Sequence, residues 1–120
     1  MEANVQIFGT NKSQDTKKAL RFFKERGIKP HFVDLNKRSM SPGELERFVQ
    51  RFGLASLVDR SGKAYRKLGL EHMRVSDEQL KAKLIEDPGL MVQPLVRSQE
   101  ALGKGWDESY WRQWFERLKG

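Results

Sequence analysis

The chain has 120 residues and a mass of 14.0 kDa, which fits one domain with its own hydrophobic core. Its formal net charge is +7, and it contains no cysteine, which excludes disulfides, thiolate metal sites and catalysis by a thiol of its own. No apolar run reaches the roughly 18 residues of a membrane span, and the N-terminal residues lack the pattern of a signal peptide. We therefore expect a soluble, cytoplasmic protein with no membrane association.

The positive charge is spread over the whole chain, from Lys12 to Lys119, and is interleaved with acidic residues. No basic arm of five or six consecutive charges is present, which argues against a direct nucleic-acid-binding protein. This distribution is typical of a well-solvated surface. It leaves an acidic protein partner or a small oxyanion as possible ligands.

The first predicted elements form a βαβ unit. Residues 5–8 are rich in β-forming side chains, and Ser13 is a good N-cap for a helix over residues 14–26, which Gly27 ends. Residues 31–35 predict a second strand, and a right-handed crossover makes the two strands parallel. The predicted inner face of the helix consists of Ala19, Leu20, Phe22 and Phe23.

The next segment, at about residues 41–87, predicts a helical insertion. Two of its helices begin with a capping box, in which a serine N-cap is followed three residues later by Glu or Gln: Ser41 with Glu44, and Ser76 with Gln79. The first of these helices also has Pro42 at its first position, and the second stops before Pro88. Between them, residues 54–70 predict one or two short helices.

The C-terminal part predicts two strands and a helix. Residues 90–96 approach a strand that Pro94 interrupts, and residues 95–97 pair with 101–102 in a hairpin around residues 98–100. Asp107 is the expected N-cap of the last helix. The apolar face of that helix consists of Tyr110, Trp111, Trp114, Phe115 and Leu118.

Four blocks of sequence resemble one family in the right order: IFGTNKS at 7–13, AYRKLGL at 64–70, SDEQLKAKLIEDPGLMVQPLV at 76–96 and GKGWDESYWRQWF at 103–115. Together they resemble the arsenate reductase (ArsC) family and its Spx-like relatives. The resemblance implies an α/β, thioredoxin-like fold over residues 1–120. Such a fold has a central mixed four-stranded sheet, with the helical insertion placed between a βαβ half and a C-terminal ββα half.

In the reductases of this family a cysteine thiolate attacks arsenate, arginines hold the oxyanion, and glutathione with glutaredoxin completes the reduction. The resemblance places that cysteine at Ser13. It places the arginine that precedes a cis-proline at Gln93, and so makes Pro94 the candidate cis-proline. The oxyanion-binding positions that it implies are Lys12, Ser13, Lys17 and Gln93.

The residues present do not suit thiol chemistry. A serine hydroxyl cannot take part in thiol–disulfide exchange, and no neighbour in sequence offers Ser13 a general base. Anion binding is compatible with the sequence, because Lys12 and Lys17 flank a helix start whose free N–H groups attract phosphate, sulfate or arsenate. Gln93 can hydrogen-bond an oxyanion without neutralising it.

Three hypotheses follow. The first is a redox-inactive family member that binds a small oxyanion or a protein partner. The second is a glutaredoxin-dependent arsenate-reductase-type oxidoreductase whose cysteine was replaced by Ser13. The third is an Spx-like regulator that docks on RNA polymerase, although the CxxC switch of that group is absent, since Thr10 and Ser13 occupy its positions. Whether the chain is an enzyme stays open, and we expect no bound cofactor or metal.

Overall fold

The computed structural model describes residues 4–99 and 101–119. The chain forms two compact units: one comprises the residues up to Val33 and from Gln93 onward, and the other comprises Asp34–Val92. The second unit includes the predicted insertion at residues 41–87. The expectation of a single domain over residues 1–120 stays a prediction. Within the described residues, no helix has the length and apolar character needed to cross a membrane.

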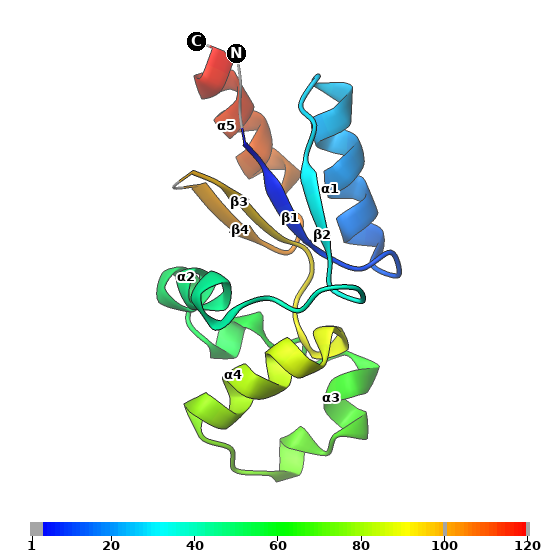
Figure 1. Cartoon of the computed structure of the whole chain (residues 1–120), viewed down its shortest axis with the longest axis vertical. Helices are drawn as coiled ribbons and strands as arrows, with labels where there is room; N and C mark the ends of the chain where they lie inside the picture. Colours follow the sequence, from blue (N-terminus) through cyan, green and yellow to red (C-terminus); the bar gives the residue numbers. More distant parts are fainter. Residues whose placement is uncertain (1–3, 100, 120) are drawn as a thin grey trace. The chain divides into compact units, whose positions relative to one another are not determined.

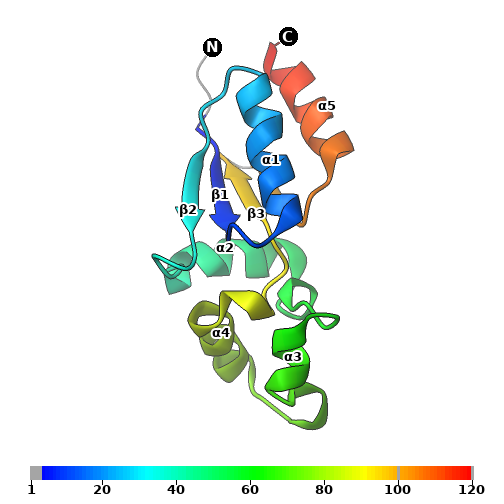
Figure 2. The same ribbon diagram turned by 90° about the vertical axis from the view of Figure 1, so that its right-hand side faces the viewer.

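Four strands form one mixed sheet in the order β2-β1-β3-β4. β1 (Gln6–Gly9) pairs antiparallel with β3 (Leu95–Ser98), and β3 pairs antiparallel with β4 (Ala101–Lys104). β2 (His31–Asp34) lies on the other side of β1 and runs in the same direction as β1 (Figure 2). The sheet thus joins a βαβ half to a ββα half, which is the thioredoxin-like fold that the sequence predicted.

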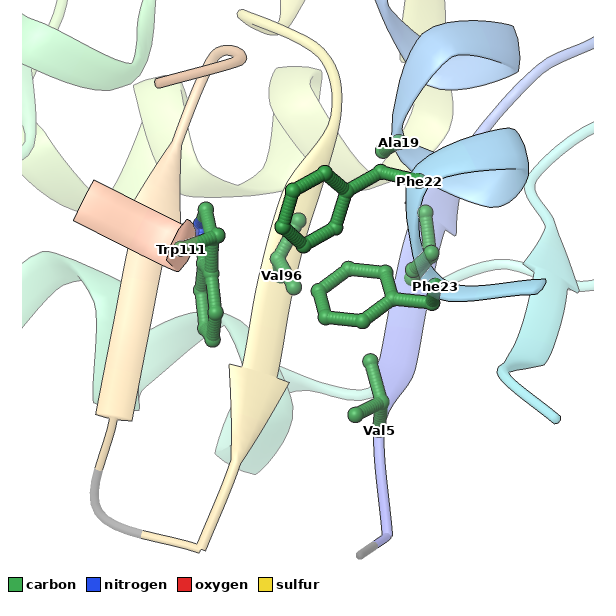
Figure 3. Packing of buried hydrophobic residues seen from close by; sticks show 7 residues of the cluster. Val5, Ala19, Phe22, Phe23, Val96 and Trp111 are labelled. Carbon is green, nitrogen blue, oxygen red and sulfur yellow. The ribbon is translucent and has the colours of Figure 1, made fainter. Parts of the chain in front are cut away.

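Two helices of the first unit, α1 (Gln14–Glu25) and α5 (Glu108–Lys119), pack against the same face of this sheet (Figures 1 and 2). Their shared core consists of Val5, Ile7, Ala19, Phe22, Phe23, Val96 and Trp111. In Figure 3 the two phenylalanine rings of α1 lie beside Val96 and face Trp111 of α5. The rings of Phe23 and Trp111 meet edge to face, with their centroids 5.5 Å apart.

The ends of α1 follow from local sequence. Ser13 is the N-cap, and its Oγ accepts a hydrogen bond from the backbone N–H of Thr16 at 3.1 Å. At the other end, Gly27 has a φ of +76°, and its N–H donates to the carbonyl of Lys24 while the N–H of Ile28 donates to that of Phe23. This pair of bonds is a Schellman motif, which favours glycine because the left-handed conformation disfavours a Cβ.

The second unit is helical. Its α-helices are α2 (Pro42–Phe52), α3 (Lys63–Lys67) and α4 (Asp77–Glu86), and its short 3₁₀ turns are η1 (Ala55–Leu57), η2 (Leu70–His72) and η3 (Pro88–Leu90). Both predicted capping boxes form, at the starts of α2 and α4. Its buried apolar side chains are Leu35, Met40, Leu45, Phe48, Leu57, Val58, Leu70, Leu84, Leu90 and Met91. An antiparallel bridge pairs Val58, directly after η1, with Met91, directly after η3.

The main differences from the sequence-based expectations concern burial. On α1, Leu20 is only partly buried, whereas Thr16, which was not predicted to face inward, has no exposed surface. On α5, Trp111 is the one fully buried member of the predicted apolar face, while Tyr110 and Trp114 pack against the same core and stay partly exposed. The predicted hairpin forms as β3 and β4, with Gln99 at a φ of 52°, and the predicted turn residue Glu100 lies outside the described residues.

Candidate functional site

The loop between β1 and α1 is held by hydrogen bonds to its own backbone. The N–H of Ser13 donates to the carbonyl of Thr10 at 3.2 Å, and the Ser13 carbonyl accepts from the N–H of Lys17 at 3.2 Å. Because the Ser13 Oγ accepts from Thr16, the side chain is engaged as a helix cap. The loop is therefore a tight turn that ends on the first turn of α1.

A second segment, distant in sequence, reaches this loop. The side-chain Oε1 of Gln93 accepts from both the backbone N–H and the hydroxyl of Thr10, at 2.9 Å and 3.2 Å. The peptide bond between Gln93 and Pro94 is cis, the geometry that the family resemblance implies for this bond. The structure thus brings Gln93 to the loop, but its amide oxygen, an acceptor, is the atom that contacts Thr10.

Thr16 is a member of this site that the sequence reasoning missed. Its side chain is fully buried, and its Oγ1 has no hydrogen-bond partner among the described residues. It lies against the backbone of Gly9, where a Cβ would come within 2.4 Å of the Thr16 Oγ1. The signal for its burial was present, because Thr16, Ala19 and Phe23 lie on one helical stripe.

Both predicted lysines lie beside the loop and are exposed. In the described part of the chain neither Lys12 nor Lys17 forms an ion pair, so their charges are available to a ligand. Asp15, also on the first turn of α1, adds one negative charge there and lies 3.8 Å from Lys18 Nζ. The positive end of the helix dipole adds to the lysine charges, since α1 begins at this loop.

The Ser13 hydroxyl has no general base beside it in the described part of the chain. Among residues 4–99 and 101–119, no imidazole or carboxylate hydrogen-bonds to its hydroxyl, and a serine without a general base is a weak nucleophile. The described residues also contain no group of three or more His, Cys, Asp or Glu side chains able to hold a metal ion. What the loop offers an anion is two exposed lysines and, at the start of α1, the N–H groups that precede the capped Thr16.

Comparisons with known proteins agree with the resemblance noted in the sequence. A model of the ArsC family matches residues 8–114. The structure of the arsenate reductase from Vibrio cholerae is 25% identical, covers 88% of this chain and 92% of that one, and superimposes with a TM-score of 0.76. No curated protein matched the chain.

Two further structures show the same fold at lower identity. A putative arsenate reductase from Yersinia pestis is 21% identical, with a TM-score of 0.78 and coverage of 94% of this chain and 99% of that one. A possible arsenate reductase from Streptococcus mutans is 19% identical, with a TM-score of 0.77 and coverage of 93% and 98%. Since the family model spans most of its length, the chain belongs to the ArsC family.

Proposed function

We propose that this ArsC-family protein is redox-inactive and acts by binding, with a small oxyanion held at the loop of residues 10–17. The proposal is supported mainly by one observation, the identity and the hydrogen bonding of Ser13. It occupies the position that the resemblance gives to the catalytic cysteine, and its hydroxyl serves as the N-cap of α1. The chain contains no cysteine at any other position that could replace it.

Anion binding is supported by the charges around the loop. Lys12 and Lys17 are exposed and unpaired in the described part of the chain, and the first N–H groups of α1 open on the same loop. An oxyanion there receives backbone hydrogen bonds at the positive end of the helix, together with two Coulombic attractions. Both attractions weaken with salt, because the lysines are exposed.

Gln93 sets the expected affinity. Its Oε1 accepts from Thr10, and its side chain is a neutral amide that carries no charge to offset that of an anion. A neutral hydrogen bond contributes about 0.5–1.5 kcal/mol, whereas one to a charged group contributes about 1.5–3 kcal/mol. We therefore expect this site to bind an oxyanion about tenfold more weakly than the same site with arginine at position 93.

The other two hypotheses are alternatives that make different demands on the same loop. A glutathione- and glutaredoxin-dependent reductase needs a thiol at position 13, so it is reached only through Ser13→Cys or through a thiol supplied by a partner. A protein partner at the loop, RNA polymerase included, would use the same exposed lysines. The oxyanion is favoured because Lys12, Lys17 and the helix start converge on one short loop.

The test is an amide NMR titration of the whole chain with phosphate, arsenate and glutathione in separate series. We expect saturable shifts of Lys12 to Lys17 and of Gln93 with the two oxyanions. The double variant Lys12→Gln/Lys17→Gln should lose them, while Lys29→Gln, an exposed lysine outside the loop, should keep them. Flat spectra up to millimolar phosphate and arsenate would refute oxyanion binding.

The redox part has its own test. The chain as it stands should show no arsenate reduction with glutathione and glutaredoxin, because a serine oxygen cannot form the mixed disulfide. Turnover above that of a boiled sample would overturn the proposed redox inactivity. Activity that appears only in Ser13→Cys would instead show that the site has retained the remaining machinery of a reductase.

A further inference from the structure

A second surface of the first unit, which begins at Lys18 next to the residue 10–17 loop, has the features of a binding groove. It is a hollow of about 540 Å³ between one side of α1 and the beginning of α5, two helices that lie side by side in Figure 2. We call it the α1–α5 groove; its lining residues are Lys18, Arg21, Phe22, Glu25, Arg26, Trp106, Glu108 and Arg112. The volume lies within the usual range of ligand pockets.

The floor of the α1–α5 groove is aromatic and well packed. The rings of Phe22 and Trp106 meet edge to face, with centroids 5.2 Å apart. The guanidinium of Arg26 lies over the Phe22 ring, 3.7 Å from its centroid, and donates a hydrogen bond to the Phe22 carbonyl. Because these contacts fix the floor, the shape of the groove exists before any ligand binds.

The rim is charged and predominantly positive, with four cationic side chains against two carboxylates. Arg112 pairs with Glu108, and Lys18 lies 3.8 Å from Asp15 just outside the groove. These pairs are solvent-exposed, so each contributes about 0–1 kcal/mol and exchanges readily for a ligand. Arg21 is exposed and has no ion pair within the described residues, so it is the most available cation.

The spacing of these charges indicates the size of the ligand. Lys18 and Arg26 are eight residues apart on and just beyond α1, which corresponds to about 12 Å along a helix. One phosphate or sulfate cannot span that length, whereas three or four residues of extended peptide, at about 3.3 Å each, do. An extended chain with several negative charges therefore matches the groove.

The two carboxylates on the rim distinguish between kinds of polyanion. Glu25 and Glu108 repel a continuous run of phosphates, and a phosphodiester backbone has no N–H to offer them. A peptide backbone donates N–H groups to these carboxylates while its own acidic side chains meet Arg21 and Arg112. We infer that the α1–α5 groove binds an acidic peptide segment of a partner protein.

The test is an NMR titration of the full chain with hexaglutamate, at about 0.15 M salt, where the Debye length is about 8 Å and distant charges are screened. The readout is the side-chain indole N–H of Trp106 and the backbone N–H of Arg21. Hexaglutamine and an oligothymidylate of the same length serve as comparison ligands. Arg21→Glu is compared with Lys29→Glu, an exposed lysine outside the groove with the same change in net charge.

We expect hexaglutamate to give saturable shifts at Trp106 and Arg21, and hexaglutamine to give none. Arg21→Glu should weaken the affinity about tenfold or more, through loss of a charge-assisted hydrogen bond, while Lys29→Glu leaves it within about twofold. If both variants weakened hexaglutamate binding equally, the effect would come from net charge alone, and the inference would be overturned. Tighter binding of oligothymidylate at these signals would assign the groove to nucleic acid instead. Loop signals report the proposed oxyanion site separately, so either proposal can fail alone.

Discussion

The contact between Gly9 and Thr16 makes Gly9→Ala the most informative substitution in the loop. A Cβ at position 9 would lie 2.4 Å from Oγ1, 2.8 Å from Cγ2 and 3.2 Å from Cβ of Thr16, where ordinary contacts are 3.4–4 Å. The Thr16 side chain cannot turn away easily, because it is fully buried and β-branched. Its backbone is also held, since its N–H donates to Ser13.

The size of the effect follows from these contacts. Overpacking of a close-packed site typically costs about 1–3 kcal/mol. Replacing glycine by alanine returns about 0.4–1 kcal/mol by reducing the entropy of the unfolded chain. The net expectation is a loss of about 1–2 kcal/mol in the free energy of unfolding, or a melting temperature lower by about 4–8 °C for a chain of this length.

The assay is urea unfolding followed by tryptophan fluorescence, which reports on Trp111 in the core of the same unit. A double-mutant cycle with Thr16→Ala isolates the clash, because that change removes the two nearest atoms. Gly43→Ala is the control: a Cβ there meets nothing within 4 Å, and alanine favours the helix. The reasoning is refuted if Gly9→Ala is as stable as the unchanged chain, or if the effects of Gly9→Ala and Thr16→Ala simply add.

Three further outcomes are expected. A thiol introduced by Ser13→Cys should have a pKa of about 3.5–7.5 instead of about 8.5, because it lies at the start of α1; a rate of iodoacetamide alkylation that still rises through pH 8.5 would contradict this. Hydrogen bonding from Arg38 lowers the pKa of Glu44 below its ordinary 4.5. The stabilisation of the fold by ionised Glu44 should therefore be complete above that value and lost as the pH falls through the lowered pKa. Urea unfolding at several pH values should show a smaller loss of stability at low pH in Glu44→Gln than in the unchanged chain. Gly103→Ala places a Cβ 2.9 Å from the buried Trp111 Nε1 and should cost about 1–3 kcal/mol; unchanged thermal stability would mean that the indole shifts freely.

The beginnings and ends of the helices were predictable from the sequence, because the interactions that set them are local. Ser13, Ser41 and Ser76 each cap a helix by accepting from the N–H three residues later. The positive φ of Gly27 follows in the same way from its place directly after a helix. The order of strands and helices along the chain could therefore be predicted locally, whereas the thioredoxin-like arrangement of the whole sheet was predicted from the family resemblance.

The candidate site was only partly predictable. Position 13 and the two flanking lysines belong to one short segment, so the sequence itself indicates that they lie together. The contact between Thr10 and Gln93 joins residues 83 apart, and nothing in either local sequence states that the glutamine presents its oxygen to the loop. The burial of Thr16 likewise depends on Gly9 of the neighbouring strand.

Tertiary structure alone decided which faces of the helices are covered and which are open. The apolar pattern of α5 predicted five inward side chains, but only Trp111 is fully buried, because packing against α1 and the sheet selects one line of contact. The same packing brings Arg21 and Arg112, far apart in sequence, to one groove. Short-range hydrogen bonds, such as those of helix caps, are determined by residues that are close in the sequence. The place where two helices meet depends on how the whole sheet aligns them.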